Sequence, residues 1–413
     1  MKLFYFEWRK FIFRKYIVVF FLLLSLIDVF KIVMDSYQGK IDIIFIESEE
    51  NKKAYKEIYN KIKGNITEEK ISFIEQEKKR LGEIYDKKLG NHIEGEKTYS
   101  GNLYEDYRIL RQYIYEDFER CLKYKEYSRM LEKLAKENVV FYTEAGNMAG
   151  RKENEYIART YNNREIEAYY RTESLKGYFS YTFSSILMVI LCFLGIAPMY
   201  LMERESNMWN ILETTYIGRK YCRNVKIFAV IVYVCIIVAW FRLLDYFTYW
   251  FLFDIEGIEN PVWMVTGFGK SPLNCSIRYY ILYDILMKIS SIFVFAMSLL
   301  LLSFYMDKVV HVAVGFAVFL GVWLFMANGV DSLELWVKGL EMCSPVVLLD
   351  CSRLFKEFVH IEIGRYFIRG EILAAVSASC ILLLELIALN IHIGRGVAIH
   401  KKFYWFHFFM SGG

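Results

Sequence analysis

The feature that most constrains this chain is the run of residues 178 to 202, which contains no charged side chain. At 1.5 Å per helical residue, such a run is long enough to cross the ~30 Å hydrocarbon core of a bilayer. Five further apolar runs have comparable length, at residues 16–34, 226–250, 279–306, 309–330 and 371–392. The sequence therefore predicts an all-α polytopic membrane protein with six transmembrane helices.

The charged residues are separated from these runs. The chain of 413 residues is 55% hydrophobic and 24% charged, and its charges crowd into the stretch between the first two runs. A separate polar domain is therefore expected at residues 35–177. The net charge of +4 is small, and the basic residues flank the apolar runs instead of forming one cluster, so nucleic-acid binding is excluded.

The first apolar run also resembles the hydrophobic part of a secretory signal. However, Asp28, Lys31 and Asp35 stand where a signal would have a small-residue cleavage site. This favours a helix that is retained. We therefore interpret residues 16–34 as the first span.

Flanking lysines and arginines predict the orientation. They place three regions in the cytoplasm of a cell membrane: an amphipathic helix at 1–15, a segment at 203–225 and a tail at 393–413. Residues 35–177 and a loop at 331–370 are then extracytoplasmic. That loop contains basic residues, but long loops weigh less in this rule.

Apolar positions in the polar domain recur at helical spacing. One stripe runs from Ile71 to Leu89. A second contains Leu103, Tyr107, Leu110, Ile114, Phe118 and Cys121. Because such stripes need packing partners, we expect a small helical domain or a pair of long hairpins standing on the membrane.

Motifs for chemistry are missing from the sequence. It has no HExxH pair and no GxSxG elbow. Its eight cysteines are scattered, and whether Cys343 and Cys351 form a disulfide is left open. GFGKS at 267–271 resembles the end of a phosphate-binding loop, but the first glycine of that pattern would fall at Met264 and Pro272 follows. We predict no catalytic residue, no metal site and no cofactor bound by this chain.

Ionisable residues within spans are the best candidates for function, because each costs about 2.5 to 3.5 kcal/mol to insert. Asp28 and Lys31 are expected near the outer end of the first span, within reach of the interface. Arg242 and Asp245 at i, i+3 are predicted to pair, as are Asp284 and Lys288 at i, i+4.

Glu385 lies between CILLL and LIALN and has no partner nearby in the sequence, so it is expected to face the bundle interior. For Arg242 and Asp245, a local ion pair competes with contact to a substrate. We take Glu385, Arg242 and Asp245 as candidate substrate or gating residues.

The segment from Pro198 to Val232 carries the most specific pattern. An acidic pair ends the second span, a short amphipathic helix follows, and a Gly-Arg-Lys stop at 218–220 precedes the next span. In this position it resembles the permeases of ABC-2 type transporters. The matching residues are Glu203, Glu205, Leu212, Thr214, Thr215, Gly218, Arg219 and Lys226. The layout is also similar, with a basic amphipathic start, a large insertion after the first span, and CSPVVLLD at 343–350 before the last.

The resemblance implies the membrane permease subunit of an exporter for a peptide, lipid or other amphipathic substrate. ATP and Mg²⁺ are then expected on a separate ABC ATPase subunit. Its docking residues would be Glu203, Glu205, Leu212, Thr214, Gly218 and Arg219. A second permease half, identical or similar, and membrane lipid are the other expected partners.

Two other classes of protein compete with this interpretation. A membrane-anchored sensor or immunity protein would bind an external ligand through its tyrosine-rich helices without energy coupling. A membrane-embedded enzyme is disfavoured because the sequence offers no convergent catalytic set.

Overall fold

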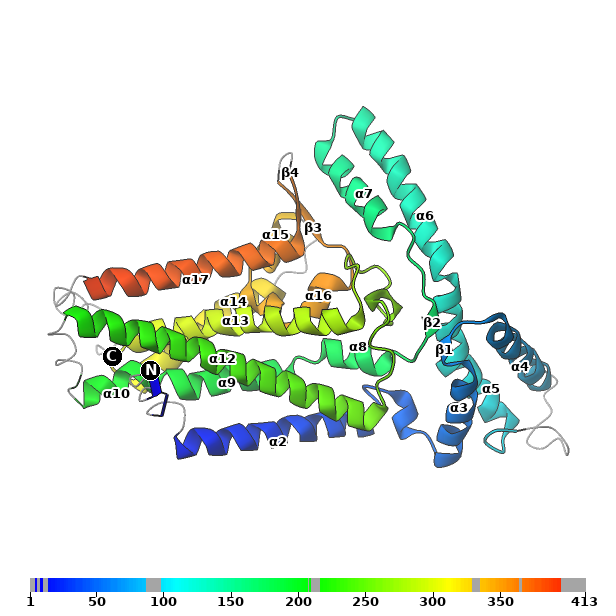
Figure 1. Ribbon diagram of the computed structural model, residues 1–413, viewed down its shortest axis with the longest axis horizontal. Coiled ribbons are helices and arrows are strands. Elements are labelled where there is room, and N and C mark those ends of the chain that lie inside the picture. Colours follow the sequence, from blue (N-terminus) through cyan, green and yellow to red (C-terminus); the bar gives the residue numbers. More distant parts are fainter. Residues whose placement is uncertain are drawn as a thin grey trace, which may run out of the picture.

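The computed structural model describes residues 4–5, 8–9, 14–86, 98–206, 208, 216–328, 335–363 and 366–394. They form a bundle of long helices with a smaller helical domain beyond one end of it (Figure 1). Strands in the described part are short: β1 (Gly64–Asn65) pairs with β2 (Ala168–Tyr169), and β3 (His360–Ile363) pairs with β4 (Tyr366–Arg369), both antiparallel. The predicted all-α, polytopic architecture is confirmed.

Six helical stretches of the described chain are long and apolar enough to cross a membrane, as predicted. They are α2 (Lys15–Tyr37), the consecutive α8 (Glu173–Ser180), α9 (Phe183–Ile196) and α10 (Pro198–Glu205), then α12 (Tyr216–Phe253), α13 (Ile277–Tyr305), α14 (Val309–Asn328) and α17 (Gly370–Gly394). Figure 1 places the start of α2, the end of α10, the start of α12 and the end of α17 at one end, away from the polar domain.

One predicted helix end differs from the structure, and the second span is not one continuous helix. The helix α12 begins at Tyr216, so Gly218 and Arg219 lie in its first turn and do not stop a preceding helix. The second span is divided twice, before Phe183 and at Pro198. Proline is the first residue of α10, a position where its missing N–H removes no intrahelical bond.

The polar domain consists of helices, as its apolar stripes predicted. Beyond a 3₁₀ turn at Ile43–Ile46 it contains α3 (Glu49–Ile62), α4 (Glu68–Asp86), α5 (Leu103–Ile109), a π-helical turn (Leu110–Tyr115), α6 (Glu116–Glu144) and α7 (Met148–Tyr161). Leu110, Ile114 and Phe118 are fully buried in the core. The helices α6 and α7 form a hairpin that projects from the molecule (Figure 1), and its turn uses Gly146 at φ +70°.

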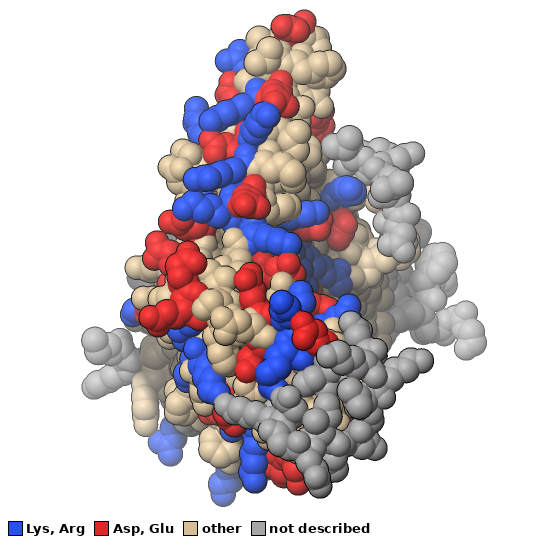
Figure 2. Space-filling model, turned by 90° about the vertical axis from the view of Figure 1, so that its right-hand side faces the viewer, with Lys and Arg blue, Asp and Glu red and all other residues tan. Residues whose placement is uncertain are grey.

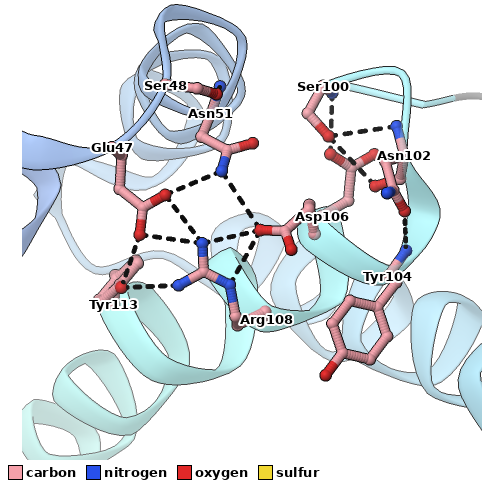
Figure 3. A network of polar contacts seen from close by, with 10 residues as sticks. Glu47, Ser48, Asn51, Ser100, Asn102, Tyr104, Asp106, Arg108 and Tyr113 are labelled. Carbon is pink, nitrogen blue, oxygen red and sulfur yellow. Dashed lines mark hydrogen bonds and ion pairs between the residues drawn. The ribbon is translucent and has the colours of Figure 1, made fainter.

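A polar network joins the start of α3 to α5 (Figure 3). The Arg108 guanidinium donates to Glu47 at 2.8 Å and to Glu105 at 2.7 Å, and Asn51 donates to Glu47 at 2.8 Å. Burial acts to raise the pKa of Glu47, but hydrogen bonds from Asn51, Arg108 and Tyr113 hold it below its usual range. The ionised Glu47 therefore stabilises this corner of the domain.

Arg108→Met is expected to weaken this corner by about 1 to 3 kcal/mol, which corresponds to roughly 5- to 150-fold faster amide exchange in α3. A carboxyl group with a depressed folded-state pKa stabilises above its unfolded pKa of about 4.3 and loses that contribution as pH falls below it. The difference between wild type and variant should therefore shrink below about pH 4. Hydrogen exchange measured between about pH 2.5 and 7, after correction for intrinsic exchange rates, tests this. Equal exchange rates in the two proteins would contradict the role of Arg108.

The polar domain is attached to the bundle through the loop between α12 and α13. The buried Arg164 donates to the carbonyls of Ser271 at 2.8 Å and Leu273 at 3.0 Å. Tyr124 and Tyr161 donate to the carbonyls of Gly269 and Lys270. The GFGKS stretch thus lies in this attachment loop and presents backbone acceptors to the domain.

The described residues of the segment predicted as an extracytoplasmic loop, 331–370, pack against the spans. It contains α15 (Leu335–Met342), a 3₁₀ turn (Pro345–Leu349), α16 (Cys351–Phe355) and the β3–β4 hairpin. Ser291 of α13 donates to the carbonyl of Pro345 at 2.7 Å, and Ser344 donates to the carbonyl of Trp323 in α14 at 2.9 Å. CSPVVLLD is therefore a packing element of the bundle. Cys343 and Cys351 are both free thiols.

The outer face of the polar domain carries both positive and negative side chains. Figure 2 shows Lys and Arg interspersed with Asp and Glu over this face and along the projecting hairpin. Continuous basic tracks are what nucleic-acid binding requires.

Candidate functional site

The two ion pairs predicted from spacing are present, and the structure joins them into one buried network. Lys288 lies 2.6 Å from Asp284, which is 2.7 Å from Arg242, and Arg242 is 3.0 Å from Asp245. Ser184 of α9 donates to Asp245 at 2.8 Å. Each of the four charged side chains is at most 1% exposed. The network therefore connects three spans, α9, α12 and α13, inside the bundle.

Arg242 is the centre of this network. It contacts two carboxylates on different helices, and its guanidinium carbon lies 4.1 Å from the centre of the Tyr178 ring. A guanidinium suits such a position because it stays charged, binds carboxylates with its planar fork and stacks on aromatic faces. Sequence spacing identified Arg242 and Asp245, but it did not reveal Tyr178.

Asp28 of α2 belongs to the same site, which corrects the prediction that it reaches the interface. Its side chain is fully buried, and Tyr181 donates to one of its oxygens at 2.8 Å. Its carboxyl group also interacts electrostatically with that of Asp245. Lys31 pairs instead with Asp35 on the outside of the helix. The hydroxyls of Tyr181 and Ser184, within the uncharged run 178–202, were the available sequence signal for this site.

The described groups of this site comprise three carboxylates, Asp28, Asp245 and Asp284, and two cations, Arg242 and Lys288. One oxygen of Asp28 and one of Asp245 have no hydrogen-bond partner among the described residues. Two ionised carboxylates this close repel each other, whereas one shared hydrogen would bond them. The arrangement is chemically suited to holding one proton between α2 and α12.

Glu385 faces the bundle interior, as predicted. It is 7% exposed, and its carboxylate accepts a hydrogen bond from Ser298 of α13. The structure does not bring it to Arg242, since Ser298 follows Lys288 by ten residues, or about 15 Å along α13. The candidate intramembrane residues therefore occupy two separate places in the bundle.

Glu203 and Glu205 have different environments. Glu203 is 1% exposed and forms an ion pair of 2.7 Å with Lys226, which links α10 to α12. This burial removes the carboxylate of Glu203 from the set of exposed docking groups. Glu205 is exposed at the end of α10. Leu212 and Thr214 lie outside the described residues, and for Gly218 and Arg219 the structure gives only their place in the first turn of α12.

A groove lies between the polar domain and the last span, with a volume of about 690 Å³. Its apolar wall is formed by Ile372, Leu373 and Val376 of α17. The rest of the lining mixes charged, aromatic and apolar side chains, among them Arg159 and Tyr156 of α7. Such a groove is chemically suited to an amphipathic molecule.

A cluster with metal-ligand chemistry lies beside this groove, at Glu153, His360 and Glu362. Burial and the charge of Glu362 raise the pKa of Glu153 to about 7, and burial lowers the pKa of His360. Sequence analysis predicted no metal site and missed this cluster, because Glu153 is far from the other two residues in the chain.

No protein-family model, no curated protein and no solved structure matches this chain.

Proposed function

We propose that this chain is the membrane permease subunit of an ATP-driven exporter, with ATP and Mg²⁺ bound by a separate ATPase subunit. The observation that supports it best is the exposed Glu205, which lies with the first turn of α12 at the same end of the bundle as the start of α2 and the end of α17. We assign this end to the cytoplasm of a cell membrane. The polar domain is then extracytoplasmic.

The helix α12 provides a physical route from this end to the buried network. It is one helix from Tyr216 to Phe253, so its first turn and Arg242 are roughly 40 Å apart on the same rigid element. The buried ion pair of Glu203 with Lys226 fixes α10 to α12. A push on α10 by an ATPase therefore moves α12 and shifts Arg242 against α13, the kind of rocking that alternates access.

The groove beside α17 supports an amphipathic substrate, such as a peptide or a lipid. Its apolar wall belongs to a membrane-spanning helix, and its polar wall belongs to the polar domain. A second permease half, identical or similar, would complete the transport path.

Glu205→Lys is expected to reduce both association with the ATPase and ATP turnover of the purified complex by at least tenfold. The reason is that the substitution reverses the charge at an exposed docking position. Glu126→Lys is the matched control, because it makes the same change at an exposed position in the polar domain. An intact complex with unchanged turnover would remove Glu205 from the docking surface.

A ligand sensor without energy coupling is the second candidate, and the same groove favours it. It predicts that ligand binding persists in the purified chain and that no ATPase is needed for its cellular effect. Loss of that effect when the ATPase is inactivated would exclude this candidate.

A further inference from the structure

Three metal-ligating side chains meet where the polar domain contacts the β3–β4 hairpin. Glu153 lies on α7, and His360 and Glu362 lie on β3. Strand residues two apart point to the same face, so His360 and Glu362 both face α7 while Ile361 between them is buried on the other side. Regular strand geometry therefore directs two ligands toward the third.

The distances suit one small cation. Nδ1 of His360 lies 3.3 Å from Oε1 of Glu153, and one ligand atom from each of the three residues lies within 4.8 Å of the others. For a tetrahedral ion with ligand bonds of 2.0 to 2.2 Å, neighbouring ligand atoms are about 3.3 to 3.6 Å apart. Small side-chain rotations reach that geometry.

The surroundings restrict these side chains. Phe358 stacks on Tyr156 at 5.2 Å and on Phe367 at 5.7 Å, and the rings form one wall of the cluster. Two glutamates are brought together here, and Lys338 is the nearby cation that acts on His360. Arg369, opposite His360 in the hairpin, is directed to Glu371 and Tyr156. Among the described residues, neither Glu153 nor Glu362 forms an ion pair with a lysine or arginine.

We propose that Glu153, His360 and Glu362 bind a divalent transition-metal ion of the Zn²⁺ class, with a fourth position open to water. An imidazole with two carboxylates matches the ligand preferences of Zn²⁺, whereas Mg²⁺ requires six oxygen ligands in octahedral geometry. The ion bridges α7 to β3, and β4 leads directly into α17. Metal binding therefore fixes the polar domain to the last span.

The test is equilibrium dialysis of the purified full chain against ZnCl₂, with bound metal measured by mass spectrometry. The wild-type chain is expected to bind one Zn²⁺ at this site. Glu153→Gln, His360→Ala and Glu362→Gln are each expected to weaken binding at least tenfold, since even outer-shell changes weaken metal sites 10- to 100-fold. MgCl₂ in the same experiment is expected to give no binding at this site.

The matched control is Glu155→Gln, which removes the same charge from the same helix at a residue paired with Arg151. It is expected to leave Zn²⁺ binding unchanged. Circular dichroism checks that each variant is folded, and Glu362→Gln at a partly exposed strand position serves if His360→Ala fails that check. Equal Zn²⁺ binding by the wild type and Glu362→Gln, or equal loss in Glu155→Gln, would overturn the proposal.

Discussion

Arg242→Met is expected to destabilise the bundle by about 3 to 5 kcal/mol, the largest effect on stability among our predictions. The substitution leaves Asp245 and Asp284 buried without the cation that lies between them. Chemical unfolding of the purified chain in detergent measures the effect. Arg278→Met is the control, because its pairing with Glu259 is about 70% exposed and such surface pairs contribute only about 0 to 1 kcal/mol.

Asp28→Asn tests the charge of the site without changing its packing. An asparagine keeps the shape of the aspartate and can donate a hydrogen bond to Asp245, where two carboxylates would repel. We expect this variant to be at least as stable as the wild type. Destabilisation as large as that of Arg242→Met would contradict a hydrogen shared between Asp28 and Asp245.

Glu385→Leu is expected to lower ATP turnover of the proposed permease–ATPase complex at least tenfold while leaving the stability of the chain unchanged or increased. A carboxyl group in a span costs about 2.5 to 3.5 kcal/mol to insert, and one intramembrane hydrogen bond returns only about 0.6 kcal/mol. A residue that does not stabilise its helix is retained for contact with a substrate or for gating.

Turnover per folded complex and unfolding of the chain are both required for this test. Leu383→Ala, an exposed position on the same helix, is the control for changes in α17 alone. A Glu385→Leu chain that is less stable but turns over normally when folded would assign Glu385 a packing role.

The spans and the polar helices could be predicted because each depends on a local pattern. The uncharged run at 178–202 needs only its length to identify a membrane helix, and the stripe through Leu110, Ile114 and Phe118 needs only its spacing. The ion pairs of Arg242 with Asp245 and of Lys288 with Asp284 were local as well. The joining of the two pairs into one network could not be predicted, because it depends on how α12 packs against α13.

The remaining differences between prediction and structure arise because the residues in contact are far apart in the sequence. Asp28 was expected to reach the interface, since nothing near it in the sequence reveals Tyr181 as a partner. Glu203 was expected on the surface, but Lys226 across the helix pair buries it. The helices and hairpin within the segment 331–370 were not predicted, because hydroxyl contacts such as that of Ser291 with Pro345 leave no periodic pattern.

In the proposed topology, Glu205 and the start of α12 lie in the cytosol while the polar domain lies outside. The most direct test is labelling of intact cells with a membrane-impermeant maleimide, using Ser206→Cys and Lys133→Cys and subtracting the signal of the native cysteines. We predict that Lys133→Cys, at a position 79% exposed in the polar domain, reacts in intact cells, and that Ser206→Cys reacts only after the membrane is permeabilised. Labelling of Ser206→Cys but not Lys133→Cys in intact cells would contradict this topology.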